Sequence, residues 1–112
     1  MPIVNCFVSP YCKLRSSNSS QLIDLWSTES GKPADEMTIN ILHCNEQLGK
    51  QYRVMANLVL PSIWSSGDIS LLQVGLAKAI SMFFEIPLSE VFVATNIVNS
   101  GMVVESGKEV QW

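Results

Sequence analysis

Apolar residues group along this chain into short strand-like segments and longer helix-like ones. Leu22, Leu25 and Trp26 stand at positions i, i+3 and i+4, which predicts a helix over about residues 19–30. Residues 68–85 are apolar on most sides and predict a second helix that is covered by other parts of the protein on most of its surface. Strands are predicted over residues 2–8, 37–44, 51–60 and 90–97, and a C-terminal hairpin over 102–105 and 109–112.

The predicted elements follow one order, strand–helix–strand, which occurs twice. Residues 33–39 (Pro-Ala-Asp-Glu-Met-Thr-Ile) match residues 87–93 (Pro-Leu-Ser-Glu-Val-Phe-Val), and each stretch follows a helix and opens a strand. The two units span about residues 2–45 and 50–98 of a single domain, 1–112. Because crossovers between parallel strands are right-handed, the pattern predicts an α/β (α+β) fold: a four-stranded mixed sheet with both helices on one face.

The other face of this predicted sheet has no cover from its own chain. The sequence is 47% hydrophobic but only 15% charged, against about 25% charged residues in an average soluble domain. A small domain with a bare sheet face and so little charge is expected to hide apolar surface in an oligomer.

Charge and cysteine usage exclude several functional classes. The net charge is −3 and the seven basic residues are scattered, so no nucleic-acid partner is expected. No apolar run approaches the roughly 20 residues that span a bilayer, and no secretory signal is recognised, so no membrane partner is expected either. Cys6, Cys12 and Cys44 form no CxxC pair and indicate free thiols in a reducing cytoplasm.

The second residue is the most informative candidate for chemistry. Removal of Met1 would leave Pro2 as a free secondary amine, and terminal amines ordinarily have pKa values of about 8. An apolar pocket lowers such a pKa, and a general base works best when its pKa lies near the operating pH. While Met1 is retained, the Pro2 nitrogen is an amide and cannot act as a base. The alternative is that Pro2 simply opens an edge strand, where no N–H is needed.

Other reactive residues suggest little by themselves. His43 is the only histidine and has no second ligand at metal spacing, so no metal site and no cofactor are expected. Asp35 and Glu36 precede a strand and need no catalytic role. Tyr11 and Trp64 flank the expected pocket wall, where surface or interface packing explains them equally well.

Four features together resemble the tautomerase superfamily: Pro2 opening a strand, the two strand–helix–strand units, Gly31-Lys32-Pro33 after the first helix, and Ile86-Pro87-Leu88-Ser89-Glu90-Val91 after the second. In length the chain is most similar to the macrophage migration inhibitory factor type, and the likeness runs from Pro2 to about Val104. It implies a homotrimer whose sheets pack into a central barrel, with pockets at subunit interfaces. It also implies keto–enol tautomerisation, with Pro2 moving the protons.

The resemblance also suggests residues that bind substrate. Lys32 matches a pocket lysine that meets a substrate carboxylate, although it could equally complement the helix dipole. Arg15 matches a loop arginine with the same task in shorter tautomerases, or is an exposed loop residue. Ser62 and Ile63 fall where a Ser-Ile pair usually offers a backbone N–H, unless Pro61 takes that place. Phe92 and Ala94 stand where the family has Tyr and Asn donors; Ile63, Phe92 and Val103 are expected beside Pro2.

The leading hypothesis is an isomerase that tautomerises a small unsaturated or aryl keto acid in the cytoplasm. The alternative is a non-catalytic trimeric binding or interaction module of the same fold, which the missing donors favour. A hydrolytic dehalogenase or decarboxylase ranks third, because those enzymes need an arginine pair or an acid near the proline, and no arginine follows Arg53.

Overall fold

The computed structural model describes residues 1–12 and 20–112. Its strands are β1 (Ile3–Val8), β2 (Thr38–His43), β3 (Val54–Pro61), β4 (Val91–Val98), β5 (Val103–Glu105) and β6 (Lys108–Val110). Its helices are α1 (Ser20–Ser30) and α2 (Ser66–Phe84), with two short 3-10 turns, η1 (Ala34–Glu36) and η2 (Leu88–Glu90).

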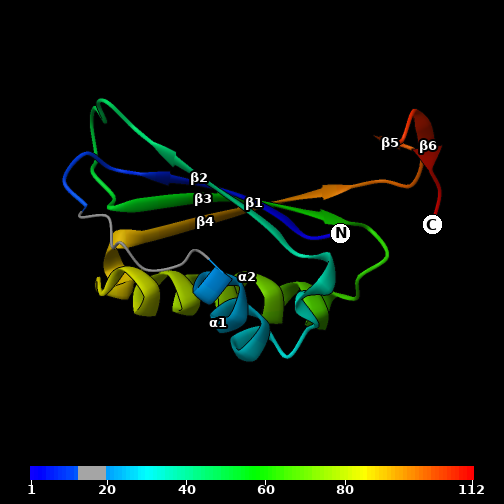
Figure 1. The fold of residues 1–112 in the computed structure, drawn as a ribbon, viewed down its shortest axis with the longest axis horizontal. Coiled ribbons are helices and arrows are strands. Elements are labelled where there is room, and N and C mark those ends of the chain that lie inside the picture. Colours follow the sequence, from blue (N-terminus) through cyan, green and yellow to red (C-terminus); the bar gives the residue numbers. More distant parts are fainter. Residues whose placement is uncertain (13–19) are drawn as a thin grey trace.

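The main sheet has the order β2-β1-β3-β4 and carries α1 and α2 on the same face (Figure 1). The pairs β1–β2 and β3–β4 are parallel, and β1–β3 in the middle is antiparallel. Each strand–helix–strand unit therefore supplies one parallel pair. The predicted four-stranded mixed sheet with a C-terminal hairpin is confirmed.

The core lies between the sheet and the two helices. Along β1, Val4, Cys6 and Val8 are fully buried against the helices and alternate with residues that face the other way. Trp26 of α1 is also fully buried, and its Nε1 donates to the Leu72 carbonyl of α2 at 2.9 Å. This bond satisfies the polar atom of the large aromatic side chain and ties the two helices together.

The helices approach most closely at Gly75 of α2. A Cβ atom there would lie 3.0 Å from the backbone nitrogen of Ser30 and 3.1 Å from the carbonyl carbon of Glu29. The absence of a side chain at Gly75 thus allows α2 to lie directly against the end of α1, just before Lys32.

The apolar stretch of the α2 helix is longer than we expected from the sequence. By length and composition alone it could cross a membrane, contrary to the expectation that no run approaches that length. Seven of its residues, from Leu72 to Phe84, are buried within the described part of the chain. Their side chains belong to the hydrophobic core that α2 shares with the sheet and α1.

Several element ends differ from the prediction for identifiable reasons. The two matching Pro-x-x-Glu stretches form η1 and η2, which delay the starts of β2 and β4. Helix α2 begins at Ser66 rather than Asp68, because the Ser65 hydroxyl caps it by accepting from the Asp68 N–H at 3.1 Å. The hairpin turns at Ser106 and Gly107, both with positive φ, so β6 begins at Lys108 rather than Glu109.

Candidate functional site

The chain start lies beside the segment that precedes β2. Strands β1 and β2 run parallel from the pair Ile3–Thr38, so the residues before them are neighbours. Pro2 is buried, and its carbonyl accepts from the Thr38 N–H at 3.0 Å. The Met1 ammonium lies 3.8 Å from Oε2 of Glu36. The position predicted for the base is therefore enclosed, with a carboxylate nearby.

Two shallow grooves surround this N-terminus. One, of about 430 Å³, is lined by Met1, Ile3, Asp35, Glu36, Thr38 and the β5 residues Val103, Val104 and Glu105. The other, of about 220 Å³, is lined by Met1, Glu36, Pro61, Ile63, Glu105, Val110 and Trp112. Ile63 and Val103 thus line grooves beside Met1, while their contact with Pro2 stays a prediction.

The charged residues of these grooves were not predicted. Asp35, Glu36 and Glu105 line them, and no lysine or arginine does so among the described residues. Glu36 could have been found from the sequence, because the residue before a strand that pairs in parallel with β1 must lie near the chain start. The surroundings of Met1 are acidic, which opposes the approach of a carboxylate.

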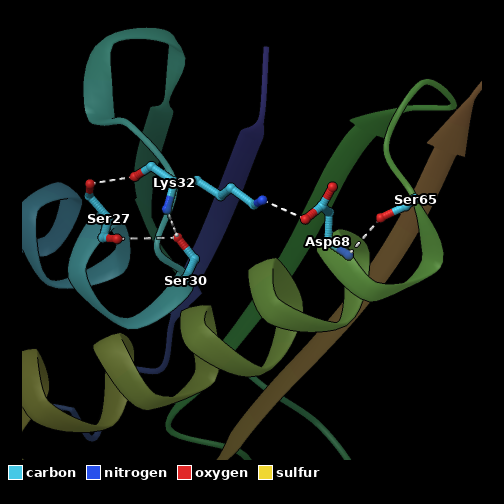
Figure 2. Close-up of polar contacts among 5 residues, drawn as sticks. All are labelled: Ser27, Ser30, Lys32, Ser65 and Asp68. Carbon is cyan, nitrogen blue, oxygen red and sulfur yellow. Dashed lines mark hydrogen bonds and ion pairs between the residues drawn. The ribbon is translucent and has the colours of Figure 1, made fainter.

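Lys32 is held at both its backbone and its side chain, as Figure 2 shows. Gly31, with φ 72°, ends α1 and turns the chain outward. The Ser27 hydroxyl then donates to the Lys32 carbonyl at 2.5 Å, and the Lys32 N–H donates to the Ser30 hydroxyl at 3.3 Å. The Lys32 ammonium lies 2.5 Å from Oδ1 of Asp68 at the start of α2.

The Lys32–Asp68 pair joins the two units of the chain. Hydrogen bonds from Lys32 and then from Ser65 hold the pKa of Asp68 below its ordinary value. The Lys32 ammonium also lies 5.4 Å from the centre of the Trp64 ring, and the Lys32 side chain is only 20% exposed. The indole Nε1 of Trp64 is buried without a hydrogen-bond partner in the described structure. Lys32 is thus a paired cation in this structure, more engaged than either sequence interpretation supposed.

Of the two residues where the resemblance suggests a backbone N–H donor, Ser62 and Ile63, the structure bonds the N–H of Ser62. Pro61 is the last residue of β3, and the Ser62 N–H donates to the Val98 carbonyl at 2.9 Å. The Ser62 hydroxyl accepts from Nε1 of Trp112 at 2.9 Å. Both polar groups of Ser62 hold the C-terminal part of the chain to the sheet.

Phe92 lies far from Pro2 within one chain. The β4 residue in line with Ile3, through Val59, is Asn96. Phe92 is four residues further along β4, about 13 Å at 3.3 Å per residue. It packs on Tyr52 with ring centres 5.3 Å apart and a tilt of 51°. Only a second copy of the chain could bring Phe92 to the Pro2 region.

The remaining candidates add no catalytic group. Arg15 lies outside the described residues. His43 at the end of β2 and Tyr11 are exposed. Burial raises the pKa of the Cys6 thiol to about 12, so this cysteine is not a nucleophile at neutral pH. Within residues 1–12 and 20–112, no three His, Cys, Asp or Glu side chains gather closely enough to hold a metal ion.

Comparisons with known proteins identify the fold. No family model matches the sequence, and no curated protein matches it. The fused 4-OT, described as an asymmetric trimer, superposes with a TM-score of 0.78 at 14% identity, covering 96% of this chain and 94% of that one. N1, a member of the cis-3-chloroacrylic acid dehalogenase family, gives 0.74 at 12% identity, covering 96% and 82%.

The macrophage migration inhibitory factor from Oncomelania hupensis gives a TM-score of 0.70 at 12% identity and covers 98% of this chain and 82% of that one. Each of these three structures superposes on nearly the whole of this chain. The likeness predicted from Pro2 and the repeated units is therefore confirmed at the level of structure, and this chain has the tautomerase/migration inhibitory factor-like fold.

Proposed function

We propose that this chain, once Met1 is removed, is a cytoplasmic tautomerase that acts as a homotrimer on a small unsaturated or aryl keto acid. The observation that carries the proposal is the buried Pro2 just before β1, next to Met1, which lines two grooves, in a fold shared with 4-OT and migration inhibitory factor structures.

Pro2 would act as the proton carrier. In ketonisation the enol oxygen loses a proton and the neighbouring carbon gains one, and a single amine can take the first and return it as the second. The Glu36 carboxylate, which lies 3.8 Å from the Met1 ammonium in the unprocessed chain, would be the acidic group nearest to this amine.

Substrate binding would rely on apolar walls and one cation. Ile63 and Val103 already flank the N-terminus, and in a homotrimer Phe92 of a second copy would complete the wall. Lys32 or Arg15 would have to hold the substrate carboxylate against the acidic side chains of the grooves, which no described lysine or arginine lines. Lys32 can do so only by leaving Asp68, so binding of an acid would involve exchange of one carboxylate for another.

The test compares processed and unprocessed protein on the same enol substrate, such as the enol of phenylpyruvate. Mass spectrometry identifies the two forms. We expect ketonisation only after Met1 removal, and a 10²- to 10⁴-fold lower rate in Pro2→Ala, as for a lost general base. Pro87→Ala, the same change at an exposed proline before η2, serves as the control. Equal rates with and without Met1 would exclude Pro2 as the base.

The second candidate is a non-catalytic trimeric binding module. It is favoured because Lys32 is paired, the Ser62 N–H is already bonded, and Phe92 and Ala94 offer no side-chain donor. This candidate predicts a stable homotrimer with no proton transfer in either N-terminal form. The same pair of preparations therefore separates the two functions.

A further inference from the structure

A lysine with no carboxylate partner lies close to Phe92. The Lys50 ammonium is 5.4 Å from the centre of the Tyr52 ring, and the Tyr52 ring is 5.3 Å from the ring of Phe92. Lys50 is exposed and forms no ion pair within residues 1–12 and 20–112. The nearby Arg53, by contrast, is paired through Nε with Oε2 of Glu90 at 3.0 Å. Lys50, Tyr52 and Phe92, called here the lysine–aromatic cluster, thus combine an unpaired ammonium with two rings.

The segment that carries Lys50 and Tyr52 is held in place by Gln47. The Tyr52 N–H donates to Oε1 of Gln47 at 2.6 Å, and Nε2 of Gln51 donates to the Gln47 carbonyl at 2.6 Å. This segment joins β2 to β3 at the end of the sheet away from the N-terminus (Figure 1). The Tyr52 hydroxyl forms no hydrogen bond in the part of the chain that the structure describes. Both polar groups of the cluster are therefore available to a ligand.

The grooves beside Met1 lack the groups that this cluster carries. Their charged side chains are acidic, namely Asp35, Glu36 and Glu105. A substrate carboxylate would be repelled there unless a cation joined the site. Lys32 is already engaged by Asp68, so a second source of positive charge would complete the site without breaking that pair.

We propose that Lys50 and Tyr52 of a second copy enter the Pro2 site together with Phe92, where the Lys50 ammonium binds the substrate carboxylate and the Tyr52 hydroxyl donates to the neighbouring substrate oxygen. The inference rests on the proposed homotrimeric tautomerase and names residues that make it specific for keto acids. Within one chain the cluster cannot reach Pro2, because Phe92 is about 13 Å along β4 from the position in line with Ile3.

Charge and shape favour this arrangement. The Lys50 ammonium meets a groove lined by carboxylates, so the two copies attract each other at this point. The same charge offsets the repulsion between the groove and an acidic substrate. The ring of an aryl keto acid can pack on Phe92 and Tyr52 while its carboxylate contacts Lys50. The Tyr52 hydroxyl supplies the side-chain donor that Phe92 and Ala94 lack.

The first test compares an acid with its neutral ester, using protein without Met1. Lys50→Gln removes the charge, and we expect it to raise KM for the enol of phenylpyruvate about 10- to 100-fold, as for a lost hydrogen bond to a charged group. KM for the methyl ester should not change. Lys50→Arg keeps the charge and should restore the KM of the acid, and Lys78→Gln, at an exposed lysine of α2, is the control.

Two results of this comparison would overturn the role of Lys50. One is an unchanged KM for the acid in Lys50→Gln, and the other is an equal rise for acid and ester, which would not concern the carboxylate. Sedimentation confirms that each variant keeps the mass of the wild-type assembly, so that a change in KM does not reflect dissociation.

Tyr52→Phe tests the hydroxyl alone, because it keeps the ring that packs on Phe92. We expect about a 10²-fold lower kcat with little change in KM, since the substrate oxygen gains negative charge in the transition state. A wild-type kcat in Tyr52→Phe would overturn the role of the hydroxyl.

A mixed assembly tests whether the groups come from different copies. Pro2→Ala chains keep Lys50 but lose the base, and Lys50→Gln chains keep the base but lose the cation. Joint refolding of the two variants should give a higher kcat/KM than the mean of the separate parents, because some sites then receive both intact groups. No gain would overturn the assignment to a second copy. A wild type that is inactive after Met1 removal would instead refute the proposed tautomerase itself.

Discussion

Substitution of Gly75 by alanine tests how tightly the two helices meet. In an exposed helix interior, this change stabilises by up to about 1 kcal/mol, because alanine loses less backbone freedom than glycine. At Gly75 the new Cβ would lie 3.0 Å from the Ser30 nitrogen and 3.2 Å from its Cα. These are backbone atoms, which cannot move aside as the end of a flexible side chain can.

The net effect follows from two opposed terms. Overpacking of a well-filled interior costs about 1–3 kcal/mol, while the gain in helix propensity is about 1 kcal/mol. Gly75→Ala should therefore lower the free energy of unfolding by up to about 2 kcal/mol. Gly67→Ala, in the same helix, places its Cβ no nearer than 3.9 Å to any atom, here the Ser65 hydroxyl. It should be neutral or slightly stabilising.

Urea unfolding at one protein concentration, followed by circular dichroism, gives the comparison. Equal slopes for both variants ensure that midpoints report stability. If Gly75→Ala is as stable as Gly67→Ala, the close approach of α1 and α2 is absent in solution. The new Cβ would displace Ser30, whose hydroxyl accepts a hydrogen bond from the Lys32 N–H. Loss of stability should therefore be accompanied by a weaker Lys32–Asp68 pair.

Two further predictions concern acid and thiol behaviour. Because Lys32 holds the pKa of Asp68 below its unfolded value of about 3.9, the stabilisation is complete above that pH and is lost as the pH falls through the folded pKa. Urea midpoints should thus show Asp68→Asn less stable than wild type at pH 7, with a difference that shrinks below about pH 4; a constant difference would contradict this. Ellman's reagent at pH 8 should label Cys44 in the native protein, Cys12 more slowly because partial burial raises the pKa of its thiol, and Cys6 only after unfolding, because Cys6 is buried and its pKa is about 12.

Much of the fold could be predicted because the pattern of apolar residues and the right-handed crossover between parallel strands leave few possible topologies. The matched Pro-x-x-Glu stretches identified the two units, and the right-handed crossover placed both helices on one face. The same stretches were misjudged in detail. Pro33 and Pro87 adopt nearly equal φ and ψ, and each initiates a 3-10 turn that an apolar pattern does not distinguish from the first residues of a strand.

The site was predicted less well because its contacts join distant segments. Lys32 and Asp68 are 36 residues apart, and nothing in the composition of either segment pairs them. The bond between the Ser62 N–H and Val98 depends on how far β3 and β4 extend together. By contrast, the neighbourhood of Glu36 and the chain start follows from the parallel pairing of β1 with β2, and could have been inferred.

The state of the N-terminus should affect the proposed chemistry but not the fold. With Met1 present, the ammonium that pairs with Glu36 belongs to Met1, and the Pro2 nitrogen is a buried amide. Removal of Met1 adds no new packing to the core, yet it moves the cation one residue inward and creates the secondary amine. Folding and assembly should therefore be indifferent to processing, while the proposed proton transfer should depend on it entirely. A protein whose two N-terminal forms are equally stable and both fail to transfer protons would be a binding module on a tautomerase-like scaffold.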